Sequence, residues 1–139
     1  FSTTGAIEGV DFVATGDLKN LSEQNLVDCS GSYGNMGCNG GDMDAAFQYV
    51  EDNGIMSESD YPYTGTDGEC KFDKTKSVGL VTGFDDVKPE SVDQLKAALA
   101  KNPVSVAIEA DKLVFQFYRT GVLDSAKCGT NLDHGVLAV

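Results

Sequence analysis

The sequence predicts an α+β fold, with a helical half at residues 1–84 and a strand-rich half at residues 85–139. In the first half, apolar residues recur every three or four positions, which is the period of a helix. In the second half, "VSVAIEA" alternates with the period of a strand, and the final "HGVLAV" is short, branched and apolar. The chain also lacks an initial methionine and stops inside an apolar run. We therefore expect two partial domains from an internal fragment of a longer protein.

Two helices are expected in the first thirty residues. Ile7, Val10 and Ala14 have helical spacing, and Gly16 can end this helix in a left-handed conformation. Ser22 precedes "EQNLVDC" and is suited to accept a hydrogen bond from the free N–H groups of a second, short helix. The second helix would carry Leu26, Val27 and Cys29.

A glycine-rich loop, "GSYGNMGCNGGDM", leads into a third predicted helix. Its glycines allow close approaches of the backbone that a Cβ atom would forbid. Either Gly41 or Asp42 caps the helix, and Met43, Phe47 and Val50 share one of its faces. The segment that follows, "ESDYPYTGTDGECKFD", is rich in turn-forming pairs. We interpret it as an ordered connector whose aromatic residues hold it against the body.

The second half should contain one helix and at least two strands. Ser91 and Gln94 form a capping-box pattern that opens the helix "VDQLKAALAKN", and Pro103 prevents its continuation. In the strand that follows, the alternate residues of 104–108 face one side, while Ser105, Ala107 and Glu109 face the other.

Composition and charge exclude several classes of protein. With 139 residues, of which 41% are hydrophobic, the chain is about the size of one globular domain. Its net charge of -12 would repel phosphate backbones and anionic membrane surfaces, so we expect neither a nucleic-acid nor a membrane partner. No apolar stretch approaches the roughly 20 residues of a membrane span. We expect a monomer.

The four cysteines, Cys29, Cys38, Cys70 and Cys128, form no C-x-x-C pair, which disfavours a zinc site. Disulfides fit better and indicate an oxidising, secretory or lysosome-like compartment. We expect no metal and no cofactor. The triplet at 20–22, Asn-Leu-Ser, matches an N-glycosylation signal, although a solvated loop asparagine explains it equally well.

His134 is the only histidine in the chain. An imidazole can take and return a proton near neutral pH, but a lone histidine at a strand start is more often structural than catalytic. Asp133 should point to the opposite face of the strand, and Leu132 should share the face of His134. The chain has no G-x-S-x-G turn and no local signature of a reactive thiol, and Ser2 is only a weak candidate nucleophile.

Five motifs together resemble the papain family of cysteine proteases, most closely its cathepsin L-like branch. They are "FSTTGAIEG", "LSEQNLVDCS", "GCNGGDMDAAF", "YPYTG" and "NLDHGVLAV", and they span the whole chain in the family's order. The resemblance implies a papain-like two-domain fold, with a helical left domain and a partial antiparallel β-barrel right domain, truncated at both ends.

The resemblance also implies where the missing nucleophile lies. In the family the nucleophilic cysteine sits in C-G-S-C-W-A-F-S, and Phe1 and Ser2 match its last two letters. The thiol would then lie three residues before Phe1, 136 residues before His134. This separation falls within the roughly 130–150 residues typical of papain and its relatives. The orienting asparagine and the oxyanion-hole glutamine would lie outside the chain.

The resemblance assigns roles to residues that the chain does contain. His134 would be the catalytic acid and base of a thiolate–imidazolium pair. Gly40 and Gly41 would line the substrate cleft, although a tight turn explains them equally well from the residues alone. Met43, Ala107 and Leu132 would form an apolar pocket for the substrate side chain at the second position before the scissile bond. Asp133, next to Leu132, would also contact the substrate. Without the resemblance, the three apolar residues of this pocket would be assigned to the core.

The implied function is a cysteine-type endopeptidase, lysosomal or vacuolar or secreted, that hydrolyses peptides or proteins. Inhibitors of the cystatin or propeptide type are candidate further partners, and the fragment alone should be inactive. A papain-fold non-protease, either silicatein-like or a catalytically dead binding homologue, remains the alternative. The residue three before Phe1 decides between them: cysteine for a protease, serine for a silicatein-like protein, glycine or alanine for a non-enzyme. An unrelated acidic binding module with a core histidine would require the motifs to be coincidental.

The resemblance pairs Cys29 with Cys70 and leaves Cys38 and Cys128 free in this chain. The disulfide would close a loop of about 40 residues and stabilise the helical half by a few kcal/mol. Thiol titration of the denatured, unreduced chain should therefore count two free thiols. A count of four, or of none, would contradict this pairing.

Overall fold

A computed structural model describes residues 1–79 and 81–139 and confirms the α+β class. Residue 80, which belongs to the predicted helical half, lies outside the described residues. No helix in the described part of the chain has the length and apolar character to cross a membrane. The elements follow in the order α1 (Ser2–Thr15), α2 (Glu23–Cys29), η1 (Ser30–Tyr33), η2 (Gly37–Asn39), α3 (Met43–Asn53), β1 (Ile55–Met56), η3 (Lys74–Lys76), β2 (Ser77–Gly79), α4 (Val92–Leu99), β3 (Val104–Ile108), α5 (Leu113–Gln116) and β4 (His134–Ala138).

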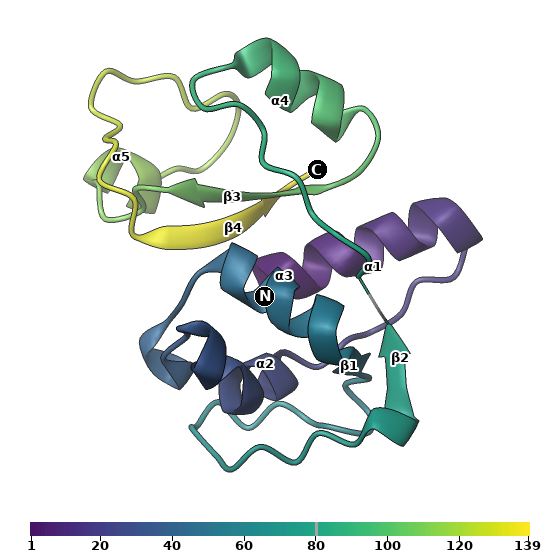
Figure 1. Ribbon diagram of the computed structural model, residues 1–139. Helices are drawn as coiled ribbons and strands as arrows, with labels where there is room; N and C mark the ends of the chain where they lie inside the picture. Colours follow the sequence, from purple (N-terminus) through teal and green to yellow (C-terminus); the bar gives the residue numbers. More distant parts are fainter. Residues whose placement is uncertain (80) are drawn as a thin grey trace.

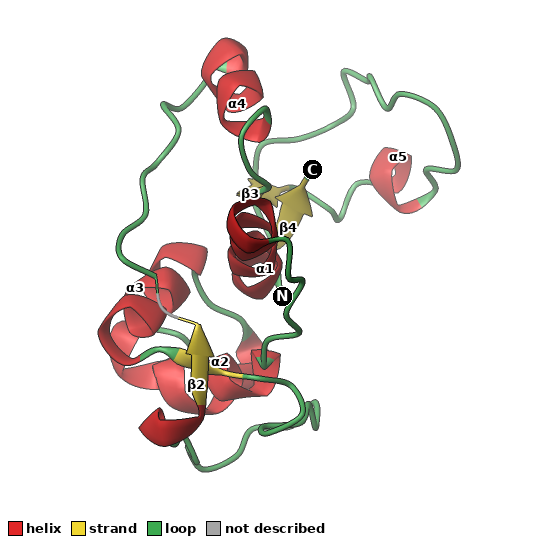
Figure 2. Ribbon diagram, turned by 90° about the vertical axis from the view of Figure 1, so that its right-hand side faces the viewer, coloured by secondary structure: helices red, strands yellow, loops and turns green. Residues whose placement is uncertain are grey.

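The elements gather in two bodies with α1 between them (Figure 1). The first body contains α2, α3, the short 3₁₀ helices and the small antiparallel sheet β1–β2. The second contains α4, α5 and the antiparallel sheet β3–β4, in which Val104 pairs with Ala138 and Ile108 with His134. Figure 2 shows α1 nearly end-on, below β3 and β4 and above the first body. The boundary at residue 84 itself stays a prediction.

The hydrophobic core lies in the first body. Helices α1, α2 and α3 surround it and strand β1 contributes to it; its members are Ile7, Leu21, Leu26, Ala46, Tyr49, Val50 and Ile55. Of the apolar residues that predict α1, Ile7 is buried, but Val10 is 45% exposed. Among the described residues beyond 84, Glu109 is the only one that is buried. Within these residues, strand pairing and the contact with α1 hold the second body.

Side-chain caps begin three of the helices as the sequence predicts. The Ser22 side chain accepts a hydrogen bond from the Asn25 N–H, and the Ser91 side chain accepts one from the Gln94 N–H. Asp42, rather than Gly41, caps α3. At the other end of α1, Gly16 adopts the expected left-handed conformation, with φ of 77°. Phe1, by contrast, provides no side-chain cap for α1.

The connector after β1 is held down by a tyrosine and a disulfide, as predicted. Tyr61 is buried, and its hydroxyl donates a hydrogen bond to Asp28 at 2.7 Å. Partial burial, followed by this hydrogen bond, raises the pKa of Tyr61 to about 12. The disulfide joins Cys29 to Cys70, with a Cα–Cα distance of 4.8 Å, and confirms the predicted pairing. Cys38 and Cys128 are free and exposed.

The two serine caps give a matched test of burial. Ser22 is fully buried and also donates to the Tyr61 carbonyl at 2.6 Å, whereas the cap at Ser91 is solvent-accessible. Ser22→Ala removes the cap and leaves that carbonyl unpaired, so it should lower the free energy of unfolding by about 2 kcal/mol or more. Ser91→Ala should cost about 1 kcal/mol or less. Urea unfolding measures both losses, and equal losses would contradict the assigned role of Ser22.

Candidate functional site

His134 begins β4, and its side chain is exposed. It is therefore not a histidine sealed in the core. The Asp133 N–H donates to the Ile108 carbonyl at 3.0 Å, and the Asp133 carboxylate accepts the Ala110 N–H at 2.7 Å. The carboxylate is thus turned to the segment after β3.

The first turn of α1 lies directly against β4. The hydroxyl of Ser2 donates to the Val136 carbonyl at 2.7 Å, and the hydroxyl of Ser105 donates to the Ser2 carbonyl at 3.1 Å. Ser2 is buried, and its hydroxyl is engaged in holding the two elements together. This contact removes Ser2 as a candidate nucleophile. It also brings the start of α1 close to the strand that begins with His134.

Two glycines allow this close packing. A Cβ atom on Gly5 would lie 2.9 Å from the side chain of Leu137, and one on Gly135 would lie 2.7 Å from the sulfur of Met43. The Thr3 hydroxyl, 3.4 Å from the Met43 carbonyl, adds a long contact between α1 and the start of α3. The beginnings of α1, α3 and β4 therefore meet at one place.

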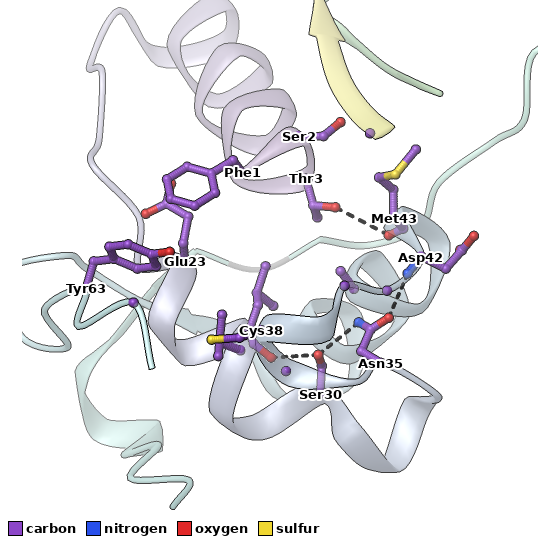
Figure 3. Close-up of a pocket in the computed structure, with 18 residues that line it drawn as sticks. Phe1, Ser2, Thr3, Glu23, Ser30, Asn35, Cys38, Asp42, Met43 and Tyr63 are labelled. Carbon is purple, nitrogen blue, oxygen red and sulfur yellow. Dashed lines mark hydrogen bonds between the residues drawn. The ribbon is translucent and has the colours of Figure 1, made fainter. Parts of the chain in front are cut away.

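A cavity of about 470 Å³ lies at this meeting point, in front of the N-terminus of α1 (Figure 3). Gly40 and Gly41 both line it and are exposed. The glycine loop is held by Asn35, whose side chain donates to the Ser30 hydroxyl at 2.9 Å and accepts the Asp42 N–H at 2.8 Å. A Cβ atom on Gly41 would overlap the Asn35 side chain, while Gly40 has a positive φ of 99°. The local structure therefore requires glycine at both positions, and the backbone of both also faces the cavity.

The three residues predicted to form an apolar pocket, Met43, Ala107 and Leu132, line the same large groove. Leu132 is 61% exposed and Ala107 is also exposed in this chain. Met43 is half-buried. That these residues form a substrate pocket stays a prediction.

Glu109 directly follows β3, and the sequence predicts no role for it beyond its place in the strand pattern. Its side chain is only 3% exposed. One carboxylate oxygen lies 2.6 Å from the Lys112 ammonium, and the other accepts the Asn131 N–H at 2.7 Å. The Lys112 interaction, followed by the Asn131 hydrogen bond, holds the pKa of Glu109 below its ordinary value. The glutamate therefore remains charged through the neutral and mildly acidic range.

Cys38 also lines the cavity and has an acidic neighbour. Its N–H donates to the Asp67 carboxylate at 2.6 Å. Partial desolvation, followed by the hydrogen bond and the negative charge of Asp67, raises the pKa of the Cys38 thiol. The described residues contain no group of three or more metal-ligating side chains. The chemistry that this site can supply is that of an exposed imidazole at the start of the strand that is hydrogen-bonded to the first turn of α1.

Comparisons with known proteins agree on one family. A family model described as papain family cysteine protease matches residues 1–139. The chain is 55% identical to the cathepsin L-like peptidase of Aedes aegypti and 48% identical to procathepsin L of Mus musculus; each alignment covers 100% of this chain and 42% of the relative. A solved structure of digestive procathepsin L 3 from Tenebrio molitor larval midgut superposes with a TM-score of 0.93 at 49% identity, covering 100% of this chain and 46% of that one. The chain thus spans less than half the length of these relatives.

The environment of Cys38 predicts the reactivity of its thiol. In a Cys128→Ser background, Cys38 should be alkylated slowly by iodoacetamide at pH 8, because its raised pKa lowers the thiolate fraction. Asp67→Asn removes the negative charge, lowers the pKa of the thiol and should accelerate alkylation. The matched control is Glu69→Gln, a nearby charge change that should leave the rate unaltered. A rate that is unchanged or slower in Asp67→Asn would contradict the assigned cause.

Proposed function

Because the chain belongs to the papain family of cysteine proteases, we propose that it supplies the histidine side of the active site in a cathepsin L-like endopeptidase. The proposal concerns the longer protein, since the chain spans 30–42% of the curated relatives it matches. One observation supports it most strongly. The first turn of α1 is hydrogen-bonded to the strand that begins with His134, through Ser2 and Val136.

The nucleophile of the proposed enzyme is a cysteine three residues before Phe1, at the N-terminus of α1. The positive end of the helix dipole favours a thiolate over a thiol, and a protonated His134 opposite would favour it further. The two groups would therefore exist as an ion pair, with the proton on the imidazole.

The reaction proceeds in two steps. The thiolate attacks the carbonyl carbon of the peptide, the C–N bond breaks, and the imidazolium of His134 gives its proton to the leaving amine. His134 then takes a proton from water, which attacks the thioester and releases the acid and the thiolate. A backbone N–H and a side-chain amide from outside this chain would hold the oxyanion.

The substrate lies as an extended peptide along the backbone of Gly40 and Gly41, which the cavity exposes. Its second side chain before the scissile bond enters the apolar surface formed by Met43, Ala107 and Leu132. This surface favours a hydrophobic or aromatic residue. Asp133 contacts substrate through its main chain, since its carboxylate is already bound to the Ala110 N–H.

Peptides and proteins are the proposed substrates of a monomeric enzyme, and inhibitors of the cystatin or propeptide type would occupy the same cleft. The disulfide between Cys29 and Cys70 supports an oxidising compartment, either lysosomal or vacuolar or the cell exterior. The relatives named above are a peptidase and procathepsins. They offer no support for the silicatein-like or catalytically dead alternative.

His134→Ala in the full-length protein tests the proposal. The change removes the acid and base, so kcat/KM for a peptide with an apolar second residue should fall by about 10²–10⁴-fold. An epoxide that traps active-site thiolates should also label the variant more slowly than the unaltered protein. Asp124→Asn, an exposed change outside the site, is the control and should retain full activity. Undiminished hydrolysis by His134→Ala would contradict the proposal.

A further inference from the structure

A long segment, residues 109–133, joins the two strands of the second body and delivers His134 to the site. Most of this segment is exposed, and four-residue α5 is its only regular helix among the described residues. An irregular segment of this length does not by itself hold a side chain to within a fraction of an ångström. The contacts that fix the two ends of residues 109–133 must therefore also fix the start of β4.

The carboxylate of Glu109 joins the two ends of this segment. Glu109 is the first residue after β3, and it accepts the N–H of Asn131, three residues before His134, at 2.7 Å. Its other oxygen lies 2.6 Å from the ammonium of Lys112, which in turn lies 3.4 Å from Asp111. With its side chain 97% shielded from solvent, the carboxylate has lost its hydration and depends on these partners.

The segment is also built around this carboxylate. A Cβ atom on Gly129 would overlap both carboxylate oxygens of Glu109. Glycine at 129 therefore lets the chain pass close enough for the Asn131 N–H to reach the acceptor. The Asp133 N–H also donates to the Ile108 carbonyl, so the two ends of the segment stay joined up to the first pair of the β3–β4 ladder.

We propose that Glu109 is a positioning residue for His134, whose buried carboxylate sets the path of residues 129–131 and so the place of the imidazole opposite α1. This inference rests on the proposed function. Glu109 touches neither the substrate nor the reacting atoms, and acts through the backbone that leads into β4. Loss of the carboxylate loosens the imidazole, weakens its ion pair with the thiolate and lets the thiol keep its proton to higher pH.

The test uses the full-length protein and compares Glu109→Ala, Glu109→Gln and Gly129→Ala. Activity is expressed as kcat/KM per thiol titrated with the epoxide, measured across pH. In Glu109→Ala, kcat/KM per titrated thiol should fall by about 10–100-fold, mostly through kcat. The acid limb of its pH profile should move to higher pH. Glu109→Gln keeps an acceptor for the Asn131 N–H and should recover part of this loss. Gly129→Ala, which displaces the carboxylate from the opposite side, should resemble Glu109→Ala.

Gly31→Ala is the matched control, because a Cβ atom at that position meets nothing within 4 Å, and it should behave as the unaltered protein. Amide exchange at residues 129–133 should accelerate in Glu109→Ala and Gly129→Ala. Should Glu109→Ala not fold, Glu109→Gln and Gly129→Ala decide the question. Variants with lower stability but an unchanged acid limb and unchanged kcat/KM per titrated thiol would overturn the inference. An unaltered protein that never reacts with the epoxide would instead overturn the proposed function.

Discussion

The site depends on the contact between the first turn of α1 and strand β4. Ser2 bonds to Val136 of β4 and receives a hydrogen bond from Ser105 of β3, so residues more than a hundred positions apart share one polar junction. These hydrogen bonds connect the body that holds the core to a body that contributes little core of its own. This junction holds the first turn of α1 against β4, the strand that His134 begins.

The two bodies are stabilised by different means, and this difference bears on the chemistry. The first has a hydrophobic core and a disulfide that together hold the glycine loop and the start of α3 in place. The second holds His134 through a two-stranded ladder and a buried carboxylate, Glu109. Within the described residues, apolar packing and a disulfide therefore hold the first body, and strand pairing and hydrogen bonds hold the second. Catalysis by a thiolate and an imidazole requires the two bodies to keep their separation.

Features with a local cause could be predicted from the sequence. The caps at Ser22, Asp42 and Ser91 follow from side chains that bond within one turn, and the disulfide and the exposed His134 follow from motifs. Features that depend on distant partners could not. The buried Glu109 carboxylate accepts the N–H of Asn131, which lies 22 residues away, so strand alternation alone could not predict its burial. The short elements α5, β1 and β2 offer too few residues for a periodic pattern.

The central claim is that His134 stands within bonding reach of a cysteine at the N-terminus of α1. A bifunctional bromoketone, whose two reactive carbons flank one carbonyl, measures this proximity directly in the full-length protein. The account predicts that it bridges the sulfur three residues before Phe1 to a ring nitrogen of His134, as a single cross-linked peptide pair in the mass spectrum. Modification of the cysteine without a bridge, or a bridge to a different residue, would contradict the account.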